Sequence, residues 1–178
     1  MPPSFDAVDH LKALIRQVPD YPKPGVLFYD ITTLLRDPAG FKAAIDQLAQ
    51  PFAGAGIDVV VGIESRGFIL GGSVADRLGA GFCPIRKPGK LPAKTRRESF
   101  HLEYGSDAIE IHEDALAPGQ CALILDDVLA TGGTAKAAAS LVRQIGGTLY
   151  GLAFLIELDF LKGRDQLAGE RILSVLHY

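Results

Sequence analysis

Two adjacent carboxylates, Asp126 and Asp127, directly follow the aliphatic run CALIL at residues 121–125. The run is typical of a buried strand, and the alanine-rich residues 135–145 are typical of a helix. Between the acids and the helix lies a loop of small residues, ATGGT, at 130–134. Glycines let backbone N–H groups approach an anion, a helix start adds partial positive charge, and threonine hydroxyls add donors. Because the carboxylates could accept hydrogen bonds from ribose hydroxyls or lie near a divalent cation, this order predicts a site for a phosphorylated sugar.

Other nucleotide-binding motifs do not explain this loop. The chain contains neither the P-loop pattern G-x-x-x-x-G-K-[ST] nor the dinucleotide pattern G-x-G-x-x-G, so readings as a usual ATP or NAD protein lose their main support. An ordinary strand-to-helix turn also uses small residues, and ATGGT alone leaves that alternative open. The acid pair directly before the turn favours the anion site.

A second polar loop follows the apolar run DVVVGI at residues 58–63. The loop consists of Glu64, Ser65, Arg66 and Gly67. Taken alone, Arg66 could be a surface cation or a partner of Glu64, but at a strand-to-helix turn it could bind a diphosphate with two parallel hydrogen bonds. Because the carboxyl ends of parallel strands share one edge, the two loops together predict a ligand with two separated phosphate groups.

Helical and strand-like segments alternate along the chain. Continuous apolar strands between helices imply a parallel sheet covered on both faces, so we expect an α/β fold with a doubly wound, mainly parallel sheet flanked by helices. Two alternating segments around Gly105 indicate a hairpin. The expected helices are 5–17, a helix that Asp37-Pro38 opens and that runs through 41–52, a helix from the second loop to about 78, and 135–145. The expected strands are 58–63, 81–85, 99–103, 108–111, 121–125 and, as the last, 149–157.

Length and charge narrow the classes of protein. The 178 residues contain no repeat or low-complexity linker, so we expect a single domain, 1–178. The net charge of −3 does not favour binding to nucleic acid. The segment from Arg86 to Arg97 nevertheless has six basic residues and no acidic one, which indicates a local anionic ligand. The six are Arg86, Lys87, Lys90, Lys94, Arg96 and Arg97.

Cysteine usage and hydropathy bear on the compartment. The two cysteines form no C-x-x-C motif and are typical of buried, reduced thiols in a cytoplasmic protein. No signal peptide is expected, and the apolar stretch 149–158 is too short to span a bilayer, so we expect no membrane partner. The four histidines are scattered and form no metal-ligand pattern.

Five segments together resemble the adenine phosphoribosyltransferases, a family of type I phosphoribosyltransferases. They are PDYPKPGVLFYDITTLL (19–35), GIESRGFILG (62–71), IRKPGKLP (85–92), LEYG (102–105) and LILDDVLATGGT (123–134). Many phosphoribosyltransferases share the last segment, whereas PGVLF-x-DIT, RKPGKLP and LEYG are typical of the adenine enzymes. The resemblance implies a type I phosphoribosyltransferase fold with a small N-terminal hood and a flexible loop.

The resemblance also implies an activity. Enzymes of this family transfer ribose 5-phosphate from 5-phosphoribosyl-1-pyrophosphate to adenine, giving AMP and pyrophosphate in purine salvage, with Mg²⁺. They are usually dimeric, so we expect a homodimer. The metal would be held mainly by the substrate, with Asp126 and Asp127 nearby and no direct protein ligand expected.

Roles for individual residues follow from the same resemblance. Arg66 would be the main side-chain donor to pyrophosphate, and Glu103 would handle a proton of the purine ring. A non-proline cis peptide is expected at Glu64–Ser65, and residues 87–97 would form a mobile hood that excludes water. The 5′-phosphate would be bound by Ala130, Thr131, Gly132, Gly133 and Thr134, beside the ribose-binding Asp126 and Asp127. The pyrophosphate would be bound by Glu64, Ser65, Arg66, Gly67, Arg86, Lys87 and Lys90.

The base pocket is expected to consist of Leu27, Phe28, Tyr29 and Val128. Phe28 and Val128 could sandwich the flat purine, while backbone groups of Leu27 and Tyr29 read its edge. The chain departs from the family here, because arginine is common where Tyr29 stands. This departure leaves the fine specificity for the base open.

Three alternatives remain at this point. Enzymes for 6-oxopurines commonly use a lysine that stretch 149–158 lacks, which favours a 6-amino base. A purine-sensing regulator would carry a DNA-binding extension, but too few residues precede the PGVLF motif for a winged helix. A sugar-phosphate-binding module without transfer activity would explain the loops but not Glu103 together with the basic segment.

Overall fold

The computed structural model describes residues 5–101 and 106–178, and Glu103 lies outside the described residues with the rest of the LEYG segment. The chain divides into two compact units, Met1–Gln47 and Leu48–Tyr178, and each is described by itself. The expectation of one domain over 1–178 stays a prediction. None of the helices described is long and apolar enough to cross a membrane.

The first unit contains short helices and a hairpin. α1 (Phe5–Ala13) leads to β1 (Arg16–Pro19), which pairs antiparallel with β2 (Leu27–Asp30). α2 (Thr32–Arg36) follows, and then α3 (Pro38–Ala49), which begins with a proline at a position where its missing N–H costs nothing.

The expected helix over residues 5–17 is too long. α1 ends at Ala13, and Arg16 already lies opposite Asp30 in the hairpin. Leu11 and Ile15 are both buried, although only Leu11 is helical. The spacing of apolar residues indicates which residues are buried, but not that all of them are helical. Here a turn after α1 buries Ile15, so no further helical turn is needed.

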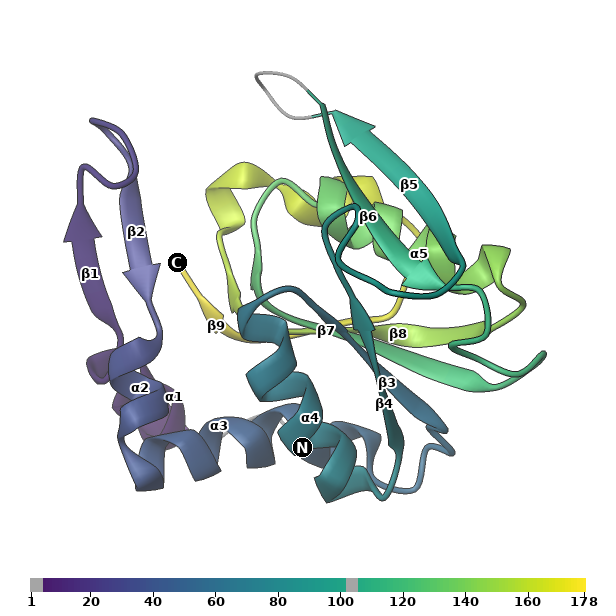
Figure 1. The fold of residues 1–178 in the computed structure, drawn as a ribbon. Helices are drawn as coiled ribbons and strands as arrows, with labels where there is room; N and C mark the ends of the chain where they lie inside the picture. The colour runs from purple at the N-terminus through teal and green to yellow at the C-terminus, as the bar shows by residue number, and fades with distance from the viewer. Residues whose placement is uncertain (1–4, 102–105) are drawn as a thin grey trace. The chain divides into compact units, whose positions relative to one another are not determined.

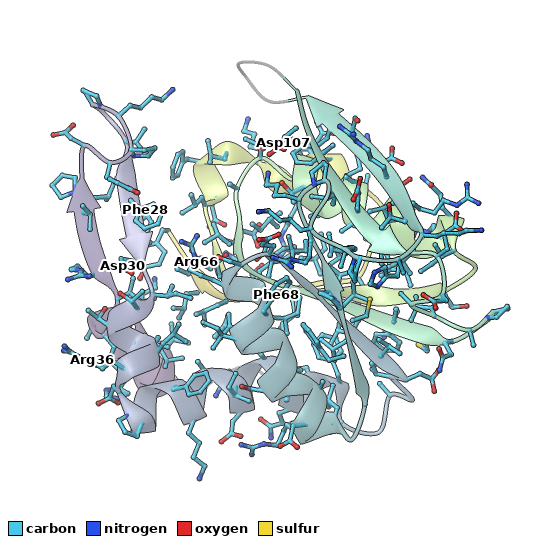
Figure 2. The ribbon with its side chains drawn as sticks, viewed as in Figure 1. Phe28, Asp30, Arg36, Arg66, Phe68 and Asp107 are labelled. Carbon is cyan, nitrogen blue, oxygen red and sulfur yellow. The ribbon has the colours of Figure 1, made fainter. Side chains whose placement is uncertain are left out.

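Asp30 connects the hairpin with the start of α2 (Figure 2). Arg16 Nε donates a hydrogen bond to Asp30 Oδ2 at 3.0 Å, and the backbone N–H of Thr32 donates to Oδ1 at 2.9 Å. Hydrogen bonds from Thr32, and then from Arg16, lower the pKa of the Asp30 carboxyl to about 2. The ionised carboxylate therefore stabilises the first unit.

We expect the Asp30→Asn variant to lose a pH-dependent part of the folding stability. A carboxylate whose pKa is lower in the folded chain stabilises the fold fully above its unfolded pKa, near 4. That contribution disappears as the pH falls through the folded pKa of about 2. Urea unfolding from about pH 6 to about pH 2 should show a difference in unfolding free energy between the wild type and Asp30→Asn that shrinks below about pH 4. A difference that stays constant over this range would contradict the assignment.

The second unit is built on a five-stranded parallel sheet (Figure 1). Its strands are β3 (Val59–Ile63), β4 (Gly81–Ile85), β7 (Cys121–Leu129), β8 (Thr148–Glu157) and β9 (Ile172–His177), in the order β4-β3-β7-β8-β9. α4 (Arg66–Leu78) connects β3 to β4, and α5 (Gly133–Gln144) connects β7 to β8. This order reverses between β3 and β7, which confirms the expected doubly wound α/β fold.

The two helices cover opposite faces of the sheet. Val61 of β3 belongs to the same buried cluster as Leu141 of α5. Its neighbour Gly62 points to the other face, where Phe82 and then Gly71 of α4 approach it. All five residues of β3 are buried, as a strand covered on both faces requires.

The expected hairpin is confirmed, but its strands are longer than the apolar alternation indicated. β5 (Thr95–His101) pairs antiparallel with β6 (Ser106–His112), and Thr95 lies opposite His112. The last residues of the basic segment, 95–97, therefore belong to a strand. The two arginines there are exposed, so pairing across the hairpin and not burial makes them extended.

Two further differences concern the end of the chain and the acid pair. β7 does not stop at residue 125 but runs to Leu129, because pairing with β8 continues past the acids and sets Val128 opposite Ile156. β8 is not the last strand, since β9 follows it. Short 3₁₀ helices complete the unit: η1 (Gln50–Phe52), η2 (Asp159–Leu161) and η3 (Gly163–Leu167).

Candidate active site

A cavity of about 310 Å³ opens where the strand order reverses, between β3 and β7. Ligands of parallel α/β sheets bind at the carboxyl ends of the strands at such a point. The structure brings residues of both expected loops together in this cavity. It is lined by Ile63, Glu64, Ser65, Arg66, Lys87, Ile109, Asp126, Asp127, Val128 and Thr134.

Arg66, the first residue of α4, bridges the two loops (Figure 2). Its Nε donates a hydrogen bond to Oδ2 of Asp127, whose side chain is only 7% exposed. The Arg66 side chain is 38% exposed, so the guanidinium faces the cavity while it is held by the buried carboxylate. The preceding peptide, Glu64–Ser65, is cis, as the resemblance implied.

The position of Asp126 depends on a close approach by α4. A Cβ on Gly67 would lie 2.9 Å from the carbonyl oxygen of Leu125 and 3.0 Å from Asp126 Oδ1, so only glycine fits there. The backbone N–H of Asp127 donates to Asp126 Oδ1 at 2.8 Å. Burial, followed by the charge of Asp127, raises the pKa of Asp126 well above its ordinary value. The neighbouring acids therefore differ in environment, since Asp127 has the cationic partner.

The three other cations expected to bind pyrophosphate, Arg86, Lys87 and Lys90, differ in their partners and in whether they line the cavity. Arg86 donates from Nε and Nη2 to the two oxygens of Glu64 at 3.3 and 3.2 Å, and these bonds lower the pKa of Glu64. Lys87 lines the cavity and forms an ion pair with Asp107 of β6 (Figure 2). Lys90 is exposed, and its carbonyl oxygen accepts a hydrogen bond from Arg86 Nη1 at 3.2 Å. Neither Arg86 nor Lys90 lines this cavity.

A smaller cavity of about 70 Å³ adjoins the first along residues 130–134, the segment called here the phosphate loop. Gly132 has a left-handed backbone, with φ of 88°, and α5 begins at Gly133. This conformation turns the chain from β7 into the helix and directs the helix start toward the cavity side. The lining residues are Asp126, Val128, Leu129, Ala130, Thr131, Gly132, Thr134, Ala135 and Phe154.

Val128 and Ala130 were expected at the site, but other apolar members of the two linings, such as Ile63, Ile109 and Phe154, were not. They lie in strands whose apolar pattern indicates core packing, and nothing local distinguishes a core residue from one that also borders a ligand. A signal for Phe154 exists only in the register of the sheet, which sets it opposite Asp126.

The residues expected to bind the base lie in different units. Val128 of β7 borders both cavities of the second unit. Leu27, Phe28 and Tyr29 are in β2 of the first unit, where the Phe28 ring meets that of Tyr21 edge to face at a centroid distance of 5.1 Å. Their common role stays a prediction, as does that of Glu103.

The basic segment is tied to β6 along much of its length. Arg86 and Glu110 exchange backbone hydrogen bonds at 3.0 and 2.8 Å, and the backbone N–H of Glu113 donates to the carbonyl oxygen of Lys94 at 3.0 Å. Residues 95–97 belong to β5. That residues 87–97 form a mobile hood over the site stays a prediction.

Comparisons with known proteins agree with this geometry. Residues 30–169 match the phosphoribosyl transferase domain family. The adenine phosphoribosyltransferase of Acidobacterium capsulatum is 60% identical over 168 residues, which cover 94% of this chain and 93% of that protein. The crystal structure of the enzyme from Rhodothermus marinus matches with a TM-score of 0.94 and 53% identity, over 98% of this chain and 100% of that one. The enzyme from Saccharomyces cerevisiae, crystallised with an imino-altritol bisphosphate and adenine, matches with a TM-score of 0.91 and 40% identity, over 96% and 99%.

The sheet, its two polar loops and the matched domain define a phosphoribosyltransferase. Within this class, the chain belongs to the adenine phosphoribosyltransferase family.

We expect Arg66→Lys to weaken binding of inorganic pyrophosphate by about tenfold, because an ammonium cannot present two parallel donors to a diphosphate. Isothermal titration calorimetry with pyrophosphate would measure the change. Arg77→Lys, in the last turn of the same helix, is the matched control and should bind like the wild type. Equal affinity of Arg66→Lys and the wild type would remove Arg66 from the pyrophosphate site.

Proposed function

We propose that the cavity where the strand order reverses is the site at which this chain transfers ribose 5-phosphate from 5-phosphoribosyl-1-pyrophosphate to adenine, giving AMP and pyrophosphate. The observation that carries the proposal is the meeting of a cationic helix start, two carboxylates and the phosphate loop along one edge of the sheet. The names of the relatives support adenine as the acceptor and purine salvage as the process.

The geometry suits the departure of pyrophosphate. The bond that breaks joins C1 of the ribose to a diphosphate oxygen, and the bond that forms joins C1 to N9 of adenine. Negative charge grows on the leaving diphosphate while C1 becomes oxocarbenium-like. Arg66 and Lys87 border the same cavity, and α4 adds its positive end, so these groups would stabilise the charge where it develops.

The other end of the donor would lie along β7 and α5. Asp126 and Asp127 offer carboxylate oxygens to the ribose hydroxyls, and Thr134 borders both cavities between them and the helix. The 5′-phosphate would bind to backbone N–H groups of residues 130–134, with hydroxyls of Thr131 and Thr134 as further donors. A fixed distance between this loop and Arg66 would select a ligand with phosphates at both ends.

The residues of the cavity are compatible with Mg²⁺ brought in by the donor. Carboxylate oxygens are the ligands that this ion prefers, and Asp126 and Asp127 present them beside the expected diphosphate position. Bound Mg²⁺ would offset negative charge on the diphosphate. The two acids would orient the ribose and contact the hydration shell of the ion.

The proposed recognition of the base rests on the resemblance to the family. Phe28 and Val128 would enclose the purine, backbone groups of Leu27 and Tyr29 would read its edge, and Glu103 would handle a proton of the ring as N9 attacks. Residues 87–97, the last three of which are in β5, would exclude water from the activated sugar.

The proposal extends to assembly and location. One family match that spans residues 30–169 supports a single functional domain over both compact units. The free thiols of Cys83 and Cys121 support a reducing compartment, and hence the cytoplasm. A homodimer rests on the resemblance alone.

We expect adenine to be preferred over hypoxanthine, guanine and xanthine by at least about a hundredfold in kcat/KM, because groups that pair with a 6-amino substituent are left unpaired by a 6-oxo one. The measurement is nucleoside monophosphate formation with the phosphoribosyl donor and Mg²⁺. Tyr29→Arg is the informative companion variant, and it should keep this preference if backbone atoms alone read the base. Preference for an oxopurine would overturn the base pocket, and donor binding without any transfer would favour a sensor.

Glu103→Gln should lower kcat about tenfold to a hundredfold with little change in the KM of the phosphoribosyl donor, because the amide cannot accept the proton of the base. Steady-state kinetics with adenine would measure both constants. Glu113→Gln, at an exposed ion pair with Arg96, is the control and should behave like the wild type. An unchanged kcat for Glu103→Gln would make Glu103 a solvated surface residue.

A further inference from the structure

Two glycines lie backbone against backbone behind the phosphate loop. A Cβ on Gly132 would lie 2.3 Å from the carbonyl oxygen of Gly163. A Cβ on Gly163 would lie 2.3 Å from the carbonyl oxygen of Ala130 and 3.0 Å from Leu129 Cδ1. Neither position can hold a side chain unless the backbone opposite moves. Gly163, the buried first residue of η3, therefore sets how far the phosphate loop can retreat from the cavity.

The residue after Gly163 is held by a two-point ion pair at the end of β8. Arg164 donates from Nε to Glu157 Oε1 at 2.7 Å and from Nη2 to Oε2 at 2.8 Å. The Glu157 side chain is 5% exposed. Burial raises the pKa of Glu157, but hydrogen bonds, first from Arg164, hold it below its ordinary value. Because Glu157 lies opposite Leu129 of β7, the pair fixes η3 to the sheet that carries the phosphate loop.

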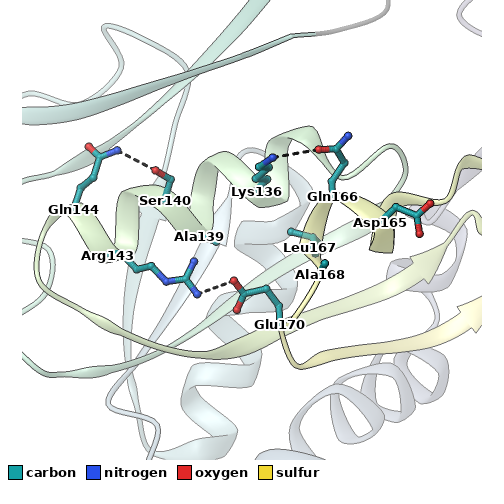
Figure 3. A pocket seen from close by; sticks show the side chains of 10 residues that line it. All are labelled: Lys136, Ala139, Ser140, Arg143, Gln144, Asp165, Gln166, Leu167, Ala168 and Glu170. Carbon is teal, nitrogen blue, oxygen red and sulfur yellow. Dashed lines mark hydrogen bonds and ion pairs between the residues drawn. The ribbon is translucent and has the colours of Figure 1, made fainter.

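Leu167 of η3 is buried in the core cluster, and the polar side-chain contacts of residues 165–170 lie at the surface. Figure 3 shows them across an open pocket of about 720 Å³ between α5 and residues 165–170. Lys136 Nζ donates to Gln166 Oε1 at 3.4 Å, and Arg143 Nη2 donates to Glu170 Oε1 at 2.7 Å. The Arg143 side chain is 51% exposed, and exposed pairs of this kind contribute little to stability. Among the polar contacts of this segment, the Glu157–Arg164 pair is therefore the one that holds the residue next to Gly163, and the burial of Leu167 anchors the other end of η3.

Glu157 also belongs to a group of possible metal ligands with Asp159 and His177. Its contacts argue for the ion pair instead. Both Glu157 oxygens accept hydrogen bonds from Arg164, and His177 Nδ1 lies 2.8 Å from Asp159 Oδ1. A cation bound to Glu157 would have to displace a guanidinium from a buried carboxylate, which is costly.

We propose that Gly163 and the Glu157–Arg164 ion pair are positioning residues for the phosphate loop, and that they set its affinity for the 5′-phosphate of the donor. None of the three lines either cavity, so they act through the backbone of residues 130–132. The inference rests on the proposed function, since it assigns the support of the same phosphate site. It makes the segment after β8 part of donor binding, although that segment lines neither cavity.

The test measures binding of ribose 5-phosphate by calorimetry, together with the thermal midpoint and the steady-state constants of the full chain. Gly163→Ala should weaken ribose 5-phosphate binding about tenfold or more, because displacements of about 1 Å at a binding loop have large effects. Arg164→Lys keeps the charge but loses the two-point geometry, so it should weaken binding about threefold. Both variants should raise the KM of the phosphoribosyl donor more than they lower kcat, and leave the affinity for pyrophosphate unchanged.

Matched controls separate positioning from general destabilisation. Gly72→Ala places a methyl group where nothing lies within 4 Å, and Arg143→Lys alters the exposed pair beside η3, so both should bind ribose 5-phosphate like the wild type. If Gly163→Ala does not fold, Arg164→Lys decides. Folded variants with a lowered thermal midpoint but wild-type affinity would overturn the inference and leave the proposed function intact. A wild type that does not bind ribose 5-phosphate would overturn both.

Discussion

Close approach of backbone to backbone determines where the two polar loops of the candidate site lie. A Cβ on Gly62 would be 2.8 Å from the carbonyl oxygen of Gly67, and one on Gly67 would be 2.9 Å from that of Leu125. The start of α4 is therefore set between β3 and β7 with no side chain between them. The phosphate loop has the same construction with Gly132 and Gly163. The cavity depends on these contacts, because any side chain there would move a loop that lines it, and with it the proposed phosphate site.

The charged side chains of the site differ in burial and in partners, although they are of similar types. Asp127 is buried and holds Arg66, so the guanidinium has a defined position before a ligand arrives. Glu64 holds Arg86 with both oxygens, and its pKa is lowered, whereas burial raises the pKa of Asp126. A diphosphate would compete with Glu64 for Arg86 and with Asp107 for Lys87, although Lys87 already borders the cavity. Arg66, Arg86 and Lys87 therefore each have a carboxylate partner before a ligand arrives.

The sequence predicted the architecture well where the residues of a single element determine its secondary structure. Continuous apolar strands such as 58–63 and glycine loops at their ends are local signals, and both the parallel sheet and the meeting of the loops followed from them. Pairing between segments that are distant in the sequence was harder to predict. The continuation of β7 past the acids and the existence of β9 depend on partners in β8, which local hydropathy does not report. The local sequence around Gly163 and Arg164 does not indicate their role. Gly163 contacts Ala130, about thirty residues away, and Arg164 pairs with Glu157 across a 3₁₀ turn.

The proposed recognition of the donor and that of the acceptor would have different physical origins in this chain. Every residue expected to bind the phosphates is in the second unit, most of them at strand ends and helix starts where backbone dipoles and glycines leave little freedom for substitution. Three of the four residues expected to bind the base, Leu27, Phe28 and Tyr29, are in a short hairpin strand of the first unit. A strand that reads an acceptor through its backbone tolerates a change of side chain, since its N–H and C=O groups remain. On the proposed reading of the base by the backbone of β2, Tyr29 would replace the family's arginine without a change in the proposed donor site, which glycines and buried carboxylates would fix.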